Sequence, residues 1–305
     1  MKHASLTRSP FVQESAEVVA QESVSSRYFR LRLKSPGVAV RAKPGQFVML
    51  ACRPDTPNLT DPLLPRPLAL LDADAQSGVL ELLYFVAGRG TALLQAAVGS
   101  CTDSPSDCAP LHRDARQGLP APRLRIIGPL GNGFEPVPDC TVHIAVGGGS
   151  GVAPLAFFFR RWPQQVQGER HLILAARAAD QLARTDVVAA RDATLHEATD
   201  DGSRGFKGNA IACLQGLLDG PLKGKRVAIY AAGPDPMMAA AGRLARERGL
   251  PCRVSLESRM GCGVGVCRSC VVDGLTPHPK TGLKRRTVCQ DGPVFDPCEL
   301  AGRVI

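Results

Sequence analysis

The sequence predicts a multi-domain α/β plus β protein: an N-terminal antiparallel β-barrel, a parallel-sheet α/β domain and a small cysteine-rich domain. Short apolar runs separated by Gly and Pro fill the first 100 residues, as in small barrels. From about residue 139, strand-like runs alternate with glycine turns and helix-like stretches. Five of the eleven cysteines lie between residues 262 and 298. For a chain of 305 residues we therefore expect domains at 1–138, 139–249 and 250–305.

The barrel strands are expected where apolar residues recur at short spacing. These segments are 30–33, 46–51, 68–71 and 79–86, and 124–134 is expected to be a last strand with its turn. Residues 100–122 are rich in Pro, Ser and Asp without periodicity, which predicts a surface loop inserted in this domain. Cys101 and Cys108 in this loop have no second pair nearby, so we do not expect them to bind metal.

The second domain is predicted from strands that run into loops. Apolar runs at 141–146, 171–176 and 226–231 indicate strands, and helical spacing follows at 152–161, 209–218 and 236–248. Gly147, Gly148, Gly149 and Gly151 end the first strand at a helix start, where a pyrophosphate binds in such sheets. A lone glycine turn is as readily structural. TDDGS at 199–203 and AAGPDPM at 231–237 add two loops at strand ends, which favours a dinucleotide crevice.

Four cysteines have the spacing of plant-type ferredoxin ligands. Cys262, Cys267, Cys270 and Cys289 follow C-x4-C-x2-C with a distant fourth residue, the pattern for a [2Fe-2S] cluster. Glycines at 261, 263 and 265 would let backbone amides approach the sulfurs. The alternative is structural zinc, although zinc usually takes two separate short-spaced pairs. Cys298 could replace Cys289, but the DGPVF turn beside Cys289 favours Cys289.

A flavin is expected because a nicotinamide exchanges two electrons at once and an iron-sulfur cluster carries one. The barrel offers an arginine, an aromatic residue and a Gly-Thr turn for its pyrophosphate and ring. The segments are Arg66-Pro67-Leu68-Ala69, Leu83-Tyr84-Phe85 and Gly90-Thr91. Each also has a purely structural interpretation, as a surface arginine, a core tyrosine and a helix N-cap.

The composition excludes two other classes of protein. Although the net charge is +9, the 37 basic residues are spread along the chain, and three Tyr and one Trp offer little surface for stacking on nucleic-acid bases. No apolar stretch approaches the roughly 18 residues of a membrane span. The start MKHASLTRSPF lacks an apolar signal core, so we expect a cytoplasmic protein with reduced cysteines. The basic group Lys280, Lys284, Arg285 and Arg286 before Cys289 suits either docking or a solvated turn.

Taken together, the motifs resemble a known family. RPLAL, LYFVAGRGT, GPLGNGF, VGGGSGVAPL, TDDGS, AGPDPM and MGCGVGVCRSC with VCQDGPVF occur in the order found in electron-transfer subunits of class 1B (NAD-dependent) dihydroorotate dehydrogenase, within the ferredoxin-NADP reductase superfamily. The resemblance implies an FAD-binding barrel, a Rossmann-like NAD domain and a C-terminal [2Fe-2S] domain. It places FAD at the three barrel segments and the cluster on the four cysteines named above. The family usually has Arg where Phe85 stands, so a cation there would have to come from Arg89.

The resemblance also implies a division of labour. It assigns no catalytic residue to this chain, and the sequence lacks the (β/α)8 repeat of a substrate-oxidising subunit. The implied partner is an FMN-containing dihydroorotate dehydrogenase catalytic subunit, two of each forming a heterotetramer in de novo pyrimidine (UMP) synthesis. One alternative is a related NAD(P)H reductase subunit serving a hydrogenase or a ferredoxin-linked transhydrogenase. A zinc-bearing interaction protein is the non-enzymatic alternative.

Overall fold

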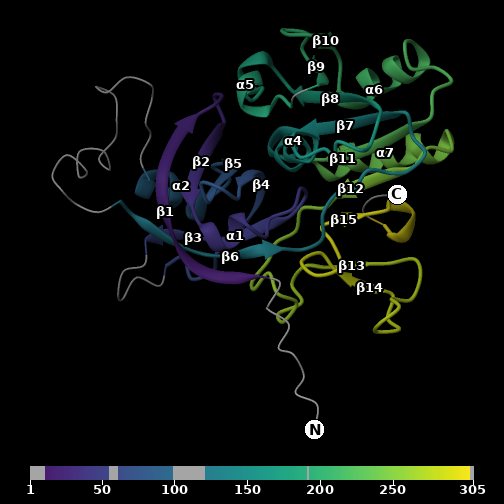
Figure 1. Cartoon of the computed structure of the whole chain (residues 1–305). Coiled ribbons are helices and arrows are strands. Elements are labelled where there is room, and N and C mark those ends of the chain that lie inside the picture. Colours follow the sequence, from purple (N-terminus) through teal and green to yellow (C-terminus); the bar gives the residue numbers. More distant parts are fainter. Residues whose placement is uncertain (1–10, 55–60, 99–120, 191, 303–305) are drawn as a thin grey trace.

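The computed structural model describes residues 11–54, 61–98, 121–190 and 192–302. Three units follow one another along the chain in Figure 1: a barrel in purple and blue, a layered domain in teal and green, and a small unit in yellow. Cys101 and Cys108 lie outside the described residues, as does most of the predicted loop 100–122.

Six antiparallel strands close the N-terminal barrel in the order β1-β2-β5-β4-β3-β6. They are β1 (Val12–Ser23), β2 (Tyr28–Lys34), β3 (Phe47–Pro54), β4 (Arg66–Asp74), β5 (Val79–Phe85) and β6 (Arg123–Leu130), with helices α1 (Pro36–Ala39) and α2 (Arg89–Val98) between them. The predicted barrel is confirmed. The apolar pattern missed β1, because its buried face combines the small Ala16 with the polar Gln21, whose carbonyl accepts the Tyr84 hydroxyl.

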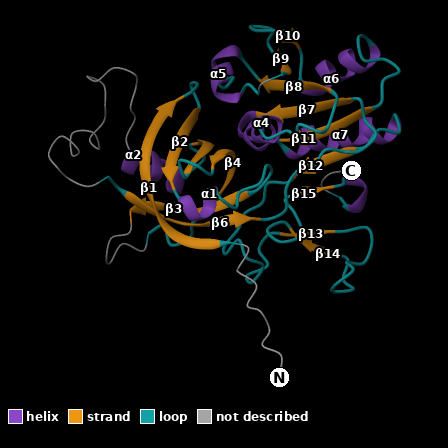
Figure 2. Ribbon diagram, in the orientation of Figure 1, coloured by secondary structure: helices purple, strands orange, loops and turns teal. Residues whose placement is uncertain are grey.

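The second unit is a seven-stranded sheet in the order β10-β9-β8-β7-β11-β12-β15. All neighbours are parallel except β12 and β15. Its strands are β7 (Val142–Gly148), β8 (Glu169–Ala176), β9 (Ala193–Thr199), β10 (Phe206–Lys207), β11 (Val227–Ala232), β12 (Cys252–Ser255) and β15 (Val294–Phe295). Figure 2 shows its helices on both faces. They are α4 (Val152–Arg160), α5 (Thr185–Val188), α6 (Ala210–Asp219) and α7 (Asp235–Glu247), and η1 (Gly149–Gly151) and η2 (Ala179–Gln181) are short 3-10 turns. The predicted parallel-sheet domain is confirmed.

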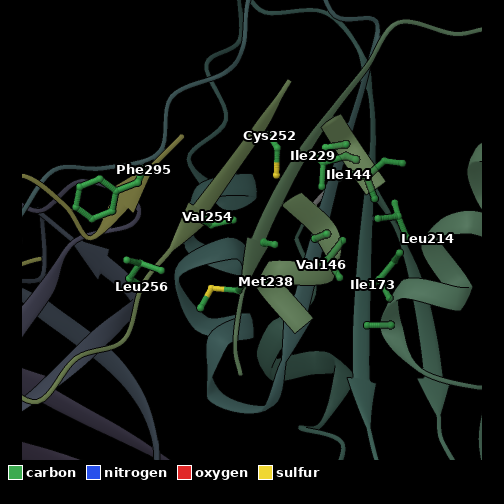
Figure 3. Packing of buried hydrophobic residues seen from close by; sticks show 14 of the residues in the cluster. Ile144, Val146, Ile173, Leu214, Ile229, Met238, Cys252, Val254, Leu256 and Phe295 are labelled. Carbon is green, nitrogen blue, oxygen red and sulfur yellow. The ribbon is translucent and has the colours of Figure 1, made fainter. Parts of the chain in front are cut away.

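The central strand β7 is buried on both faces. Ile144 and Val146 pack against Leu214 of α6 and Met238 of α7 (Figure 3), whereas Ala145 faces the core that contains α4. A strand covered on both sides reads as an unbroken apolar run, which explains why the sequence predicts it clearly. Burial of each large aliphatic side chain contributes roughly 1.5–3 kcal/mol. This packing fixes the carboxyl end of β7, where the glycines lie.

The C-terminal unit is tied to the sheet. It contains the hairpin of β13 (Val271–Asp273) and β14 (Arg285–Thr287) and the 3-10 turn η3 (Pro297–Glu299), and its strand β15 pairs antiparallel with β12. Strand β12 belongs to the parallel sheet although it follows residue 249, the predicted end of the second domain. Within the described ranges, no helix combines the length and the apolar character needed to cross a membrane.

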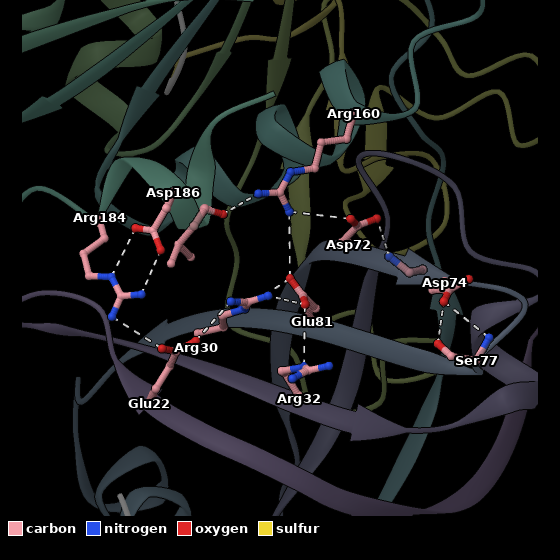
Figure 4. Close-up of polar contacts among 12 residues, drawn as sticks. Glu22, Arg30, Arg32, Asp72, Asp74, Ser77, Glu81, Arg160, Arg184 and Asp186 are labelled. Atoms are coloured by element: carbon pink, nitrogen blue, oxygen red, sulfur yellow. Dashed lines mark hydrogen bonds and ion pairs between the residues drawn. The ribbon is translucent and has the colours of Figure 1, made fainter. Parts of the chain in front are cut away.

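Arginines of the sheet domain pair with carboxylates of the barrel (Figure 4). Arg160 of α4 lies 3.5 Å from Asp72 of β4 and 3.8 Å from Glu81 of β5, and Arg184 lies 3.5 Å from Glu22 of β1. Single exposed ion pairs contribute about 0–1 kcal/mol. Here several half-buried groups are linked, so the pairs set the orientation of the two domains more than their stability.

Candidate functional site

Arg66 and Gly90 form a corner suited to a phosphate. Arg66 is the first residue of β4, and Gly90 lies in the first turn of α2. The Arg66 guanidinium lies over this turn. A methyl group added at Gly90 would come within 2.5 Å of Arg66 Nη2. Arg66 Nη1 also donates to the carbonyl of Leu64 at 2.6 Å, which orients the group. A helix N-terminus and a guanidinium together favour a phosphate, because unpaired N–H groups and positive charge face the same space.

Thr91 shapes the turn before α2. Its hydroxyl accepts the N–H groups of Ala87 at 2.9 Å and Gly88 at 3.2 Å, and it donates to the Gly88 carbonyl at 3.0 Å. The residue is buried. These hydrogen bonds use the Thr91 hydroxyl to hold the loop in place. The predicted cofactor contact at this turn would therefore come from the backbone of the turn.

The predicted aromatic segment at the end of β5 divides between two environments. Leu83 and Tyr84 are buried side chains, and the Tyr84 hydroxyl donates to Gln21 inside the barrel. Burial raises the pKa of the Tyr84 hydroxyl. Phe85 is half-buried instead and lines a cleft between the barrel and the sheet domain.

This cleft has a volume of about 370 Å³. The Phe85 ring meets Tyr28 edge-on with 6.0 Å between centroids, and the Arg27 guanidinium lies 5.6 Å from the Phe85 centroid. Arg89, the residue that would have to supply a cation near Phe85, forms an ion pair with Asp61. The guanidinium over the Phe85 ring is that of Arg27, just before β2.

Two of the four predicted glycines, Gly148 and Gly149, border the cleft. Gly149 has a φ of +59°, and a methyl group there would lie 2.6 Å from Tyr28 Oη. A methyl group at Gly148 would lie 2.9 Å from Met237 Sδ. Both glycines therefore let the side chains of Tyr28 and Met237 pack closely at the start of η1, on the border of the cleft.

Gly147 and Gly151 serve packing inside the sheet domain. A methyl group at Gly151 would come within 2.3 Å of the Ala232 carbonyl oxygen, at the end of β11. One at Gly147 would lie 2.9 Å from the Val152 Cα. These two glycines let the turn close against its neighbours, and neither lines the cleft.

Two residues of the cleft, Tyr28 and Glu257, are not among those predicted from the sequence, whereas Asp200 comes from the predicted TDDGS loop. Glu257 follows β12 and keeps part of its side chain exposed. Desolvation in the cleft raises the pKa of its carboxyl group, and the nearby Asp235 carboxylate adds to the increase. Asp200 belongs to the TDDGS turn, which gave a local signal, but nothing in the sequence near Tyr28 or Glu257 marks them as cleft residues.

The four predicted cysteine ligands gather as two pairs. Cys262 and Cys267 lie together on the outer side, and Cys270 lies against Cys289, each of these two only 2% exposed. The described residues contain no group of three His, Cys, Asp or Glu side chains arranged to hold one metal ion. A two-iron cluster takes one thiolate pair on each iron, so the arrangement fits [2Fe-2S].

Backbone amides point at the sulfurs as the glycines predict. The N–H groups of Val264 and Cys267 donate to Cys262 Sγ at 3.4 Å each. Gly265, with a φ of +83°, directs its N–H at Cys289. Such bonds stabilise negative charge on sulfur and tune the potential of a bound cluster.

The thiols differ in their readiness to ionise. A hydrogen bond from Ser269, whose Oγ lies 3.2 Å from the sulfur, lowers the pKa of Cys267 to about 6. Burial raises the pKa of Cys289 to about 12, and the adjacent Cys270 adds to this. Cys298, the alternative ligand, lies on η3, where its backbone N–H donates to Oδ1 of the N-cap residue Asp296 at 2.9 Å.

A second cavity of about 460 Å³ lies beside the cysteine loop. Lys280 and Arg285 of the predicted basic group line it, as does Arg286. Arg286 is buried and donates to backbone carbonyls of Thr276 and Leu283, so it stabilises its own loop. Arg286 is therefore not part of a solvated turn, whereas Lys280, Lys284 and Arg285 are exposed, and a docking role for them stays a prediction.

Comparisons with known proteins agree with this arrangement. Residues 257–301 match the family model described as the iron-sulfur cluster binding domain of dihydroorotate dehydrogenase B. The chain is 34% identical over 281 residues to the dihydroorotate dehydrogenase B (NAD(+)), electron transfer subunit of Desulforamulus reducens, covering 92% of this chain and 95% of that protein. It is also 34% identical to the protein of the same name from Geobacillus thermodenitrificans, covering 96% and 98%.

Solved structures share the architecture. The NADH-dependent reduced ferredoxin-NADP oxidoreductase from a study of flavin-based electron bifurcation aligns with a TM-score of 0.72 at 26% identity, covering 94% of this chain and 90% of that one. A ferredoxin NADP+ reductase from Neisseria gonorrhoeae aligns with a TM-score of 0.56 at 15% identity, covering 79% and 93%, and shows the same fold. Given the curated relatives matched over nearly their whole length, the chain belongs to the family of dihydroorotate dehydrogenase B electron transfer subunits.

Proposed function

We propose that this chain carries electrons between an FMN-containing dihydroorotate dehydrogenase catalytic subunit and NAD, by way of a [2Fe-2S] cluster and FAD. The observation that carries the proposal is that the cleft between the domains adjoins both a predicted flavin segment and the segment that leads to the cysteine group. The segment after β12 places Glu257 in the cleft and, five residues later, Cys262 in the cysteine group. Phe85, at the end of a predicted flavin segment, borders the same cleft.

The proposal assigns roles to the residues of the barrel. Arg66 and Gly90 would hold the FAD pyrophosphate, since the guanidinium lies against the first turn of α2. The other segment residues would follow the cofactor along the end of the barrel: Pro67, Leu68, Ala69, Leu83, Tyr84, Phe85 and Thr91. When bound, FAD exchanges a hydride with the nicotinamide and single electrons with the cluster. Tyr28 and Phe85 would exclude water from that meeting point.

The sheet domain would hold the dinucleotide at Gly148 and Gly149, with Gly147 and Gly151 shaping the turn. Asp200 lies in the cleft at the carboxyl end of β9, whereas the Asp201 carboxylate is occupied by Ser203 at 2.6 Å. An acidic residue there can accept a ribose hydroxyl and repels a 2′-phosphate, which favours NAD over NADP.

We propose domain limits at 1–138, 139–256 and 257–305, since β12 belongs to the sheet and the matched iron-sulfur domain begins at residue 257.

We propose that the protein is cytoplasmic, a setting that suits the nine described cysteines, all of them free thiols. We propose a heterotetramer with two catalytic subunits, serving pyrimidine synthesis. The solved structure at 26% identity is an NADH-dependent reduced ferredoxin-NADP oxidoreductase, which makes a ferredoxin-linked reductase the second candidate. The match to an iron-sulfur domain model removes support from the zinc alternative.

Two activities of the purified chain test the proposal. Alone, it should oxidise NADH with an artificial dye and should not oxidise dihydroorotate. Mixed with an FMN-containing catalytic subunit, it should confer NAD-linked dihydroorotate oxidation. Reduction of ferredoxin in place of that linked activity would support the second candidate.

A variant that lacks a cluster ligand distinguishes electron transfer to the catalytic subunit from electron transfer to a dye. Cys270→Ser should reduce the linked activity more than the dye activity, because a small dye reaches the flavin without the cluster. The matched control is Cys213→Ser, at a buried cysteine on α6 that lies far along the chain from the ligands. Full linked activity in the cluster-free complex would contradict the proposed route.

A further inference from the structure

Asn132 joins the barrel to the turn that carries the last cysteine ligand. It follows β6, and both the oxygen and the nitrogen of its side-chain amide form hydrogen bonds. Oδ1 accepts the Val294 N–H at 2.9 Å, and Nδ2 donates to the carbonyls of Val294 at 2.8 Å and Asp291 at 3.1 Å. The Asn132 backbone N–H donates to the Gly292 carbonyl at 2.6 Å. One residue thus holds the four-residue segment that begins two positions after Cys289.

The same turn is braced from within the C-terminal unit. The Asp291 carboxylate accepts the backbone N–H of Thr287 at 2.6 Å and its hydroxyl at 3.0 Å, and His278 Nε2 lies 3.0 Å from the other oxygen. These contacts close the loop around Cys289. They do not reach the barrel, so the position of the loop relative to the barrel depends on other groups.

A second contact lies between the cysteine loop and β3. A methyl group at Gly263 would come within 2.5 Å of Met49 Cγ and 2.9 Å of Leu130 Cδ1. Met49 pairs with Pro67, in the segment assigned to FAD. Apolar packing of this kind excludes water but sets no single register, whereas the hydrogen bonds of Asn132 are directional.

We infer that Asn132 is a positioning residue that fixes Cys289, and with it the cluster, relative to the flavin barrel. This inference rests on the proposed function, because it requires a cluster at the four cysteines. It assigns to the GPLGNGF segment a role in electron transfer within the chain. Asn132 does not line the cleft and lies outside the segments assigned to FAD, so hydride exchange should be independent of it.

The test compares Asn132→Ala with Gln46→Ala in the cofactor-loaded chain. Gln46 is a matched control, since its Nε2 donates to the Gly131 carbonyl at 2.7 Å and its Oε1 accepts the Lys43 N–H at 2.8 Å. It therefore holds the same connection on the barrel side only. Two rates are measured without oxygen: loss of iron to a chelator, and bleaching of the flavin and cluster absorbance bands after mixing with NADH.

Asn132→Ala should lose iron on the order of threefold to tenfold faster, the range for one or two net hydrogen bonds. Its cluster bands should bleach more slowly than in the wild type, while the flavin bands bleach at the wild-type rate. Gln46→Ala should match the wild type in both. Asn132→Asp keeps the volume and the acceptor for Val294 but replaces the Nδ2 donor by a carboxylate oxygen that faces two carbonyls, and it replaces Ala if that variant fails to fold. It should shift both rates in the same direction.

Two results would overturn the inference. The first is wild-type iron retention and cluster bleaching in both Asn132 variants, and the second is an equal change in Gln46→Ala. A wild-type chain that binds no iron and labile sulfide would overturn the proposed function itself. The iron content of the wild type therefore distinguishes the two failures.

Discussion

The guanidinium of Arg66 rests against the backbone of Gly90, where a methyl group would lie 2.5 Å from Nη2 and 2.7 Å from Cζ. Two segments separated by more than 20 residues thereby form one positively charged corner. Any side chain at position 90 would displace the arginine. The contact explains why an arginine at the start of β4 and a glycine in the first turn of α2 belong to one site.

Replacement of Arg66 by Ala should weaken FAD binding by about 1.5–3 kcal/mol, the contribution of a hydrogen bond to a charged group. Equilibrium dialysis of the flavin at several protein concentrations measures this change. Arg89→Ala is the control, because Arg89 is exposed and already paired with Asp61. Unchanged retention in Arg66→Ala, or an equal loss in Arg89→Ala, would place the pyrophosphate elsewhere.

Replacement of Cys267 by Ser should remove most of the bound iron and labile sulfide, which we expect at about two of each per wild-type chain. Cys267 is one of the outer thiol pair with Cys262, so the substitution removes one of the two ligands on that side. Cys298→Ser should keep both, because Cys298 is held on η3, apart from the ligands. Metal and sulfide analysis of anaerobically purified protein decides the matter. Iron lost equally from both variants would show that Cys298 takes part.

The cysteine group could be predicted because its ligands are close in sequence and their spacing alone restricts the chemistry. The glycine turn was equally visible, since β7 is an unbroken apolar run that ends in it. The sequence could not show which residue each glycine contacts in the folded chain. Gly149 faces Tyr28 and Gly151 faces Ala232, and both partners lie at least 80 positions away.

The cleft residues Tyr28 and Glu257 were missed for the same reason. Each lies in a segment whose local pattern predicts only a strand or a loop, and they meet because the barrel docks on the sheet domain. Arg27 illustrates the point: its contact with Phe85 depends on the pairing of β2 with β5, which places Tyr28 opposite Phe85. Local spacing carries no information about such pairings.

Replacement of Gly149 by Ala should raise the KM for NADH in the dye assay with little change in flavin content. The position has a φ of +59°, which costs a residue with a side chain about 1–2 kcal/mol, and the methyl group would press on Tyr28 Oη. Gly216→Ala is the control, because Gly216 lies in α6 with open space around it and should tolerate a methyl group. A wild-type KM in Gly149→Ala would remove this glycine from the nicotinamide site.

The stability of the sheet domain should depend on His143. This residue on β7 is fully buried, with Nδ1 lying 3.1 Å from Tyr230 Oη. The Tyr230 oxygen also accepts the Val137 N–H at 2.8 Å. Burial lowers the pKa of His143 from 6.5 to about 4, because the charged imidazolium would lose its water. The folded protein therefore keeps His143 neutral across the mildly acidic range.

The unfolded chain takes up a proton at His143 below about pH 6.5, whereas the folded chain does so only near pH 4, so acid favours unfolding between these values. The stabilising difference is complete above pH 6.5 and is lost as the pH falls toward 4. From pH 7.5 to 5.5 this one group should lower the free energy of unfolding by about 1.4 kcal/mol. Urea unfolding at the two pH values measures the drop in the wild type and in His143→Gln, which cannot titrate. The variant should be less stable at pH 7.5 but show a smaller drop in the free energy of unfolding between the two pH values. Burial also lowers the pKa of His171 and His196, so part of the pH dependence of stability should persist in the variant. An equal drop in both proteins would show that His143 is not kept neutral by folding.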